Sequence, residues 1–375
     1  MSDPVVIVSA ARTPIGAMMG ELSGLAGHQL GSIAIRAAVE RSGLKPEQVQ
    51  EVIMGCVLPA GQGQAPARQA TIGAGLPVST GATTINKVCG SGMKALMLGH
   101  DLLVAGSQDV VLSGGMESMS NAPYLLLEGR GGYRYGHGTV FDHMALDGLE
   151  DAYDKTPVGG GKSMGQFAED CVSKYSFTRA EQDEYAIEST RRAVAANTDG
   201  SFAWEMAAVT VAGRKGETKI EKDEMPFKAN PEKIPSLKPA FRKEGTVTAA
   251  TSSSISDGAA ALVLMRESTA KRLGAKPIAR IVAHATHSQE PQWFTTAPVG
   301  AIARLYEKTG WNSKTVDLYE INEAFAVVTM AAMKEHGLPH DKVNIHGGAV
   351  ALRHPIGASG ARLAVTLLGA LRKTA

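Results

Sequence analysis

One cysteine of the chain stands in a context suited to nucleophilic chemistry. Cys89 follows the apolar run ATTINKV and precedes Gly-Ser-Gly, at the predicted junction between a strand and a helix. The thiolate is the reactive form of cysteine, and backbone N–H groups and the positive end of a helix dipole lower the pKa of a thiol. Gly90 and Gly92 leave room for a bulky acyl group. We therefore predict that Cys89 is an acyl-accepting nucleophile rather than a buried cysteine at a tight turn.

A nucleophile of this kind needs a base and a group that holds the developing oxyanion. The second half of the sequence offers His354, in the glycine-rich stretch GGAVALRHPIG, and Asn322, at the start of the predicted helix NEAFAVV. Each residue alone is more often structural, Asn322 as a helix N-cap. Because both follow predicted strand ends that match the position of Cys89, we expect the three residues to act together.

Composition narrows the possible functions. Lys plus Arg number 38 and Asp plus Glu number 37, which provides no basic surface for nucleic acid or for an acidic membrane. No apolar run approaches the roughly 18 residues of a spanning helix. The first residues carry neither a charged signal region nor an Arg/Ser-rich presequence, so we expect a cytoplasmic protein. Three irregularly spaced cysteines favour neither disulfides nor a metal site, and Cys56 and Cys171 are expected to be small buried apolar residues.

The first 120 residues alternate between strand and helix patterns. The predicted strands span 4–11, 49–57, 82–88 and 109–115, and the predicted helices between them span about 30–38, 65–74 and 90–105. This alternation predicts a mostly parallel sheet covered by helices on both faces.

From Pro277 the same pattern restarts. Strands are predicted at 278–286, 316–321 and 343–346, and helices at 299–308, 322–335 and 358–372. Gly90-Ser-Gly aligns with Ala358-Ser-Gly, which places Cys89 opposite Gly357 and indicates two equivalent junctions that face each other.

Residues 122–249 differ from both halves, because they are richer in charge, glycine and tyrosine, and we interpret them as an inserted loop domain. The predicted domains are therefore an amino-terminal half (1–121 and 250–276), the inserted domain, and a carboxyl-terminal half (277–375). The helix after Cys89 is followed by a strand, whereas the chain ends with the matching second helix. We therefore expect one or two carboxyl-terminal strands to be missing.

Several long motifs in a fixed order make the sequence resemble the thiolases along nearly its whole length, and among them the bacterial acetyl-CoA acetyltransferases. These motifs are VSAARTPIGA, NKVCGSGMKAL, GGMESMSNAPY, TSSSISDGAAALVL, EINEAFAVV and GGAVAL-HPIGASGARL. The resemblance implies an α/β fold of layered αβαβα type, with two duplicated halves. It implies condensation of two acetyl-CoA to acetoacetyl-CoA and CoA, and the reverse thiolysis. It also implies a homotetramer that needs no cofactor or metal.

The resemblance further implies a role for each candidate residue. Cys89 would accept the acyl group, His354 would activate Cys89 and polarise the second thioester carbonyl, and Asn322 would hold a water at that oxyanion site. The residues implied along the coenzyme A channel are Ser253, at the pantetheine amide, and Phe241, Met164, Phe325 and Ala249. The inserted domain would bind coenzyme A and carry the tetramer contacts.

The chain departs from the thiolase pattern in three places. It ends before the second family cysteine, which moves the α-proton, and before a glycine amide of the oxyanion hole; such losses typically cost on the order of 10²–10⁴ and 10²–10³ in rate. Arg353 stands where the family has glycine, at a position expected to need φ > 0 or a close approach, and its charge is expected to disfavour protonated His354. Ser163 stands where biosynthetic relatives often carry histidine.

Three alternative functions stay open at this point. The chain could be a broader 3-ketoacyl-CoA thiolase, and residues of the inserted domain that line the substrate pocket would decide. It could be a catalytically impaired protein with a thiolase shape, because the second cysteine is absent. It could also be a Cys–His hydrolase, which would release acetate from the same acyl-enzyme.

Overall fold

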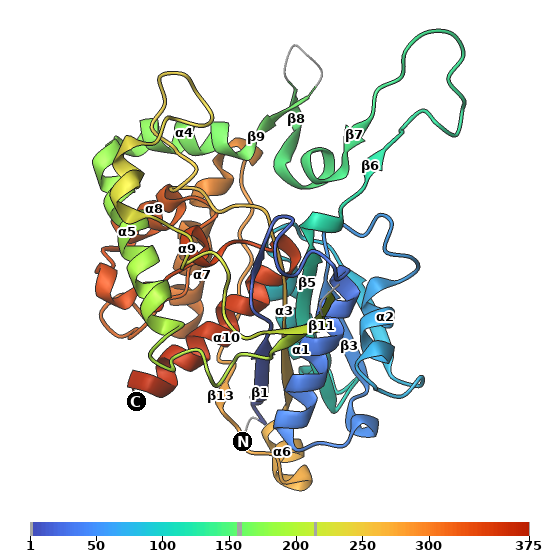
Figure 1. The fold of residues 1–375 in the computed structure, drawn as a ribbon. Coiled ribbons are helices and arrows are strands. Elements are labelled where there is room, and N and C mark those ends of the chain that lie inside the picture. Colours follow the sequence, from blue (N-terminus) through green and yellow to red (C-terminus); the bar gives the residue numbers. More distant parts are fainter. Residues whose placement is uncertain (1–2, 156–159, 214–215, 375) are drawn as a thin grey trace.

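The computed structural model describes residues 3–155, 160–213 and 216–374. A mixed seven-stranded sheet lies at its centre, in the order β13-β1-β12-β5-β3-β4, with β2 paired to the start of β12 (Figure 1). The strands of this sheet are β1 (Val5–Arg12), β2 (Gly16–Ala17), β3 (Glu51–Gly55), β4 (Gly81–Ile85), β5 (Val110–Ser118), β12 (Ser256–Arg266) and β13 (Ala279–Arg280).

The prediction of a mostly parallel sheet is wrong because of two strands from far along the chain. The five strands of the first 120 residues run in one direction, and β3 pairs in parallel with β4 and β5. Strand β13 pairs antiparallel with β1 at the edge of the sheet. Strand β12 enters between β1 and β5 and runs antiparallel to both. Its apolar sequence indicates burial but not its place or direction in the sheet.

Strand β1 shows how the sheet separates two cores. All eight of its residues are buried. Val6 and Val8 pack in the cluster that includes helices α1 (Gly27–Ser42) and α2 (Pro66–Gly73), whereas Val5 and Ile7 pack in the cluster of α3 (Ser91–Val104) and α10 (Ile356–Thr374). Because successive strand residues point to opposite faces, the result is a sheet between two helical layers.

Glycines let α3 and α10 approach each other closely. A Cβ atom at Gly92 would lie 2.6 Å from the backbone nitrogen of Ala361, and one at Gly360 would meet the backbone nitrogen of Met93. Neither position can carry a side chain without moving a helix. The first turns of the two helices therefore lie side by side, as the alignment of Cys89 with Gly357 predicts.

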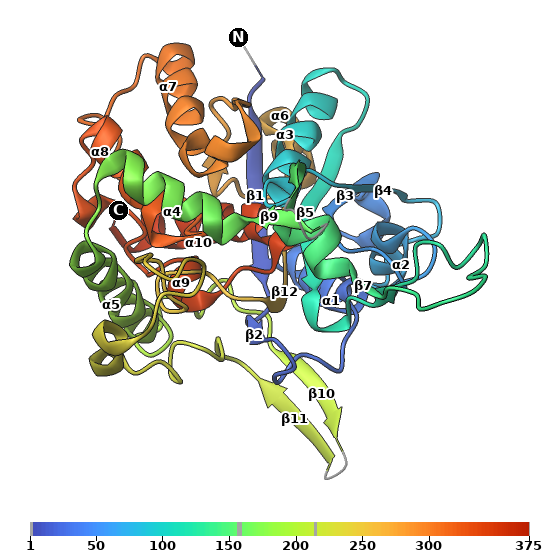
Figure 2. The ribbon, with the colours of Figure 1, turned by 90° about the horizontal axis from the view of Figure 1, so that it is seen from above.

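The other helices except α6 gather beside the sheet and away from α1 (Figure 2). They are α4 (Met164–Tyr175), α5 (Arg179–Ala196), α7 (Ala297–Thr309), α8 (Ala326–His336) and α9 (Ala349–Leu352). Helix α6 (Glu267–Leu273) follows β12 and packs through Ala270 in the cluster of α1 and α2. Helices α4 and α5, predicted within the inserted domain, pack against α8 and α9 of the second half. Among the described residues, no helix is long and apolar enough to cross a membrane.

Short two-stranded ribbons extend from this body. They are β6–β7 (Tyr124–Leu125 and Phe141–Asp142), β8–β9 (Glu150–Lys155 and Gly161–Ser163) and β10–β11 (Val209–Gly213 and Gly216–Ile220). The segment between β6 and β7 projects well away from the sheet (Figure 1).

The second half contains less strand than predicted. Within the described residues, 278–286 contributes only β13, and the segments 316–321 and 343–346 meet at a single bridge between Tyr319 and Val343. The side chain of Asn344 binds the backbone N–H and C=O of Ile321, at 2.9 Å each, where a strand would offer its backbone. These segments alternate with helices in the predicted order, but they lack neighbouring strands. The prediction of three regular strands is therefore wrong.

Candidate active site

Cys89 lies in a sharp turn between β4 and α3. Val88 has φ +47°, an unfavourable conformation for a β-branched residue, and the Ser91 hydroxyl braces the turn by accepting from Lys87 N–H at 2.8 Å and donating to the Val88 carbonyl at 2.7 Å. Cys89 is half-buried and packs beside the cluster of Val57, Leu58, Met119, Met144 and Ile356. The strained turn therefore fixes the direction of the thiol.

The environment of Cys89 does not favour the thiolate. Burial raises the pKa of Cys89 to about 11, and the carboxyl of Glu117 adds to the rise, although a backbone hydrogen bond opposes it. Helix α3 begins two residues later, at Ser91. The prediction that the helix end lowers the thiol pKa is thus wrong, because removal of solvent outweighs the dipole. Cys89 rests as a thiol and needs a base.

His354 is held in the tautomer that such a base needs. Its Nδ1 lies 2.5 Å from Ser359 Oγ, and that hydroxyl donates to the carbonyl of Pro355 at 3.0 Å. The hydroxyl hydrogen is therefore used, so Nδ1 must donate, and Nε2 is an unprotonated acceptor that faces the amide nitrogen of Asn322. Burial lowers the pKa of His354 to about 3, with a contribution from Arg362. The imidazole is neutral, and the cation beside it is Arg362 rather than the predicted Arg353.

Asn322 is positioned by its contact with this histidine. Asn322 Nδ2 lies 3.3 Å from His354 Nε2, and Asn322 Oδ1 is buried without a partner among the described residues. A buried amide oxygen of this kind is suited to accept from a bound water or substrate. The expectation that Asn322 begins helix α8 is wrong, since the helix starts at Ala326 with Phe325 as its N-cap.

Arg353 occupies the unusual backbone position expected for a glycine. It has φ +87°, which confirms that expectation, between the end of α9 and His354. Its guanidinium donates to the Val350 carbonyl at 2.6 Å, while Nε is buried without a partner among the described residues. Burial lowers the pKa of Arg353. The backbone that presents His354 is therefore strained.

His354 opens onto a cavity of about 620 Å³ with mainly apolar walls. All five candidates for the coenzyme A channel line it: Ser253, Phe241, Met164, Phe325 and Ala249. Ser163 lines it too. Cys89 and Asn322 are not among the lining residues, but Met119 and Ile356, beside Cys89, are. The structure thus brings the predicted channel residues to the histidine, with the cysteine adjoining one wall.

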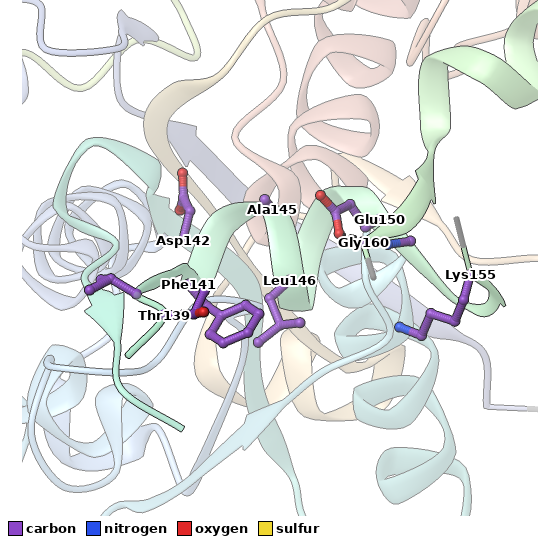
Figure 3. A pocket seen from close by; sticks show the side chains of 10 residues that line it. Thr139, Phe141, Asp142, Ala145, Leu146, Glu150, Lys155 and Gly160 are labelled. Atoms are coloured by element: carbon purple, nitrogen blue, oxygen red, sulfur yellow. Dashed lines mark hydrogen bonds between the residues drawn. The ribbon is translucent and has the colours of Figure 1, made fainter. Parts of the chain in front are cut away.

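A smaller cavity of about 340 Å³ adjoins the large one (Figure 3). Phe141, Leu146 and Lys155 point toward it from β7, the π-helical turn Ala145–Leu149 and β8. Ala145 and Glu150 line both cavities, so this turn lies between them. Neither Cys89 nor His354 reaches the smaller cavity, and it is not the candidate site.

Glu117 is a functional residue that the sequence reasoning missed. Its buried carboxylate accepts from the backbone N–H groups of Val57, Leu58 and Gly357 at 2.9–3.1 Å. It therefore joins the end of β5 to the loop after β3 and to the start of α10, around Cys89. Burial raises the pKa of Glu117 to about 7, although these hydrogen bonds act to lower it. The signal available in the sequence was a single acidic residue within GGMES, a run of small and apolar residues.

Cys171 takes no part in this arrangement, whereas the Cys56 thiol donates to Glu117 Oε1 at 3.6 Å. Cys56 and Cys171 are both buried, which confirms the prediction for them. Cys171 packs in the cluster of α4 and α8, away from Cys89.

Comparison with known protein families shows to which family the chain belongs. A family model described as the thiolase N-terminal domain matches residues 5–268, and one described as the thiolase C-terminal domain matches residues 275–375. The chain belongs to the thiolase family. The C-terminal model extends to the last residue, so the prediction that carboxyl-terminal strands are missing is not borne out.

Individual thiolases are similar over nearly the whole chain. Acetyl-CoA acetyltransferase 2 of Arabidopsis thaliana is 50% identical over 372 residues, which cover 98% of this chain and 91% of the relative. A probable acetyl-CoA acetyltransferase of Dictyostelium discoideum is 49% identical over 97% of this chain and 87% of the relative. A mitochondrial acetyl-CoA acetyltransferase of Bos taurus is 48% identical over 98% and 86%.

Proposed function

We propose that this thiolase is an acetyl-CoA C-acetyltransferase. It condenses two acetyl-CoA to acetoacetyl-CoA and CoA, and catalyses the reverse thiolysis through an acyl-enzyme on Cys89. The observation that carries the proposal is His354, which is neutral and lines the same cavity as the predicted channel residues. The names of relatives close to 50% identical over nearly the full chain support the choice of substrate.

The chemistry follows from the protonation states. His354 Nε2 takes the thiol proton of Cys89, whose pKa of about 11 leaves few thiolates at neutral pH. The sulfur bonds to the carbonyl carbon of acetyl-CoA, the bond from that carbon to the CoA sulfur breaks, and CoA leaves with the proton. His354 Nε2, neutral again, takes an α-proton from a second acetyl-CoA, and the resulting carbanion attacks the acyl carbon. The bond from that carbon to the Cys89 sulfur breaks, and the Cys89 thiolate takes the proton from His354. Asn322 holds a water that donates to the thioester oxygen of this second substrate.

Coenzyme A reaches the histidine along the cavity. Ser253 binds the pantetheine amide, and its hydroxyl is now held by the Ala324 carbonyl at 2.8 Å. Phe241 and Phe325 stand edge to face with centroids 5.8 Å apart, and with Met164 and Ala249 they provide the apolar walls that a pantetheine chain needs. No cofactor or metal takes part in this reaction.

Intact mass after brief exposure to acetyl-CoA tests the proposal directly. The chain should gain one acetyl group, Cys89→Ala should gain none, and the matched control Cys171→Ala should gain one. His354→Gln should acylate more slowly by on the order of 10²–10⁴. An unmodified, folded parent chain would instead favour the catalytically impaired alternative. Release of acetate without acetoacetyl-CoA would favour the hydrolase.

The size of the cavity supports a second candidate, a broader 3-ketoacyl-CoA thiolase. Near His354 the walls are flexible or apolar, with Met119, Leu149 and Ile356, and Ser163 is small. Such walls can admit acyl groups longer than acetyl. Comparing kcat/KM for thiolysis of acetoacetyl-CoA and 3-ketohexanoyl-CoA separates the two candidates, since a clear preference for the longer substrate would exclude the narrower assignment.

We also propose that the chain forms a cytoplasmic homotetramer. Tyr124, Leu126, Leu127 and Tyr135, on the arm between β6 and β7, are exposed, and apolar side chains gathered on one projection are typical of subunit contacts. Three free cysteines suit a reducing compartment. One relative is named as cytosolic and others as mitochondrial, so fractionation of the producing cells would test the compartment.

A further inference from the structure

Two histidines and an aspartate meet on the side of α3 remote from the active site. His100 and Asp101 lie on the last turns of α3, and His284 lies in the extended segment after β13. Asp101 Oδ1 is 3.1 Å from His100 Nδ1 and 2.8 Å from His284 Nε2. The imidazole rings stand edge to face, with centroids 5.0 Å apart. Three potential ligand atoms therefore converge on one point.

The spacing of these atoms suits a small divalent ion. All three lie within 4.8 Å of one another. Zinc bonds of about 2.0–2.1 Å at a tetrahedral angle place neighbouring ligands roughly 3.3 Å apart. An ion would enter after small outward movements of the side chains. Imidazole and carboxylate together favour zinc, nickel or copper over magnesium and calcium, which prefer oxygen ligands.

The surroundings also fit a cation. The side chains of His100 and His284 are 19% and 26% exposed, which leaves an entry path for the ion and room for a water as fourth ligand. Lys308 Nζ binds the carbonyl of His284 at 2.8 Å, which holds the segment in place.

We propose that His100, Asp101 and His284 form a binding site for a zinc-like divalent transition metal. Bound metal would tie α3, the helix that begins beside Cys89, to the extended segment of the second half. The site is structural, because it lies about three helical turns from Cys89 and faces neither cavity. Sequence spacing gave no sign of it, since 183 residues separate Asp101 from His284.

Titration of the metal-free chain with zinc sulfate, followed by calorimetry and thermal melting, tests the proposal. We expect one tight zinc per chain, and a rise in Tm of about 3 °C at a hundredfold excess over Kd. His100→Ala and His284→Ala should each weaken binding by more than about tenfold. The matched control His137→Ala removes an exposed histidine of the distant arm and should bind like the parent.

Cobalt in place of zinc identifies the ligands. Tetrahedral cobalt bound by this site should give visible bands without a thiolate charge-transfer band, and these bands should disappear in Asp101→Asn and His284→Gln, which conserve the shape of each side chain. Far-UV circular dichroism shows whether each variant is folded. Unchanged zinc binding in folded His100→Ala and His284→Ala, a thiolate band, or no binding at millimolar zinc would overturn the proposal.

Discussion

Arg353 carries a charged side chain at a backbone position that favours glycine. It combines φ +87° with a guanidinium that is largely buried and only partly hydrogen-bonded. Both features cost stability, the first on the order of 1–3 kcal/mol. Because His354 follows directly, the strain is placed where the base must be held.

Replacement of Arg353 separates these two costs. Arg353→Gly should stabilise the chain by about 1–3 kcal/mol in urea unfolding, since it removes both the strained φ and the buried charge. Arg353→Ala, the matched control, removes the guanidinium alone and should be less stable than Arg353→Gly by about 1 kcal/mol. Equal stability of the glycine and alanine variants would show that the backbone conformation is not strained.

The pKa of Cys89 predicts how the isolated thiol responds to pH. With a pKa of about 11, the thiolate fraction rises roughly tenfold for each pH unit between 7 and 10. The rate of Cys89 carboxamidomethylation by iodoacetamide, measured by peptide mapping, should rise by the same factor and show no step near pH 6.5, because His354 stays neutral above about pH 3. A plateau below pH 8 would mean that the thiol is activated before substrate binds.

At the scale of the elements, the contact between α3 and α10 sets the distance between the two parts of the site. Cys89 precedes α3 and His354 precedes α10, and the helices touch through Gly92 and Gly360. A side chain at either glycine must push the helices apart. The contact therefore couples packing to catalysis.

Gly360→Ala measures this coupling. The new Cβ would meet the backbone nitrogen of Met93, so the variant should lose about 1–3 kcal/mol of stability. Acetylation of Cys89 should slow as well, since the base moves away from the thiol. Gly131→Ala, where the nearest atom is 3.7 Å away, is the matched control and should change neither quantity. A loss of stability without slower acetylation of Cys89 would refute the coupling.

The same elements show what could be predicted from sequence. The strands and helices of the first 120 residues were predictable because each shows a local apolar period, as in β1 and α1. The position of β12 was not, since its partners are distant in sequence. The environment of Cys89 was predicted incorrectly, because local sequence indicates the nearby helix end but not the Glu117 carboxyl or the burial of the thiol. The channel residues came from the resemblance to the thiolases, and all line one cavity.

At the scale of the whole molecule, the arm between β6 and β7 has no packing partner of its own size. Tyr135 is fully exposed, and Leu126 and Leu127 are more than half exposed, at 56% and 55%. In an isolated chain these side chains lose the stabilisation of about 25 cal/mol for each Å² of apolar surface that burial would provide. Figure 2 shows the arm projecting past α2, where a second chain could reach it.

Light scattering coupled to size exclusion tests whether the arm joins subunits. The parent chain should elute at four times the chain mass, largely independent of salt because the contact is apolar. Leu126→Ser combined with Leu127→Ser should reduce the mass to that of a dimer or monomer. Trp311→Ser, which alters a 49% exposed apolar residue outside the arm, should leave the tetramer intact. Because the arm follows β5, which carries Glu117, by way of β6, loss of the tetramer should also slow Cys89 acetylation. A tetramer that survives the double substitution would place the subunit contacts elsewhere.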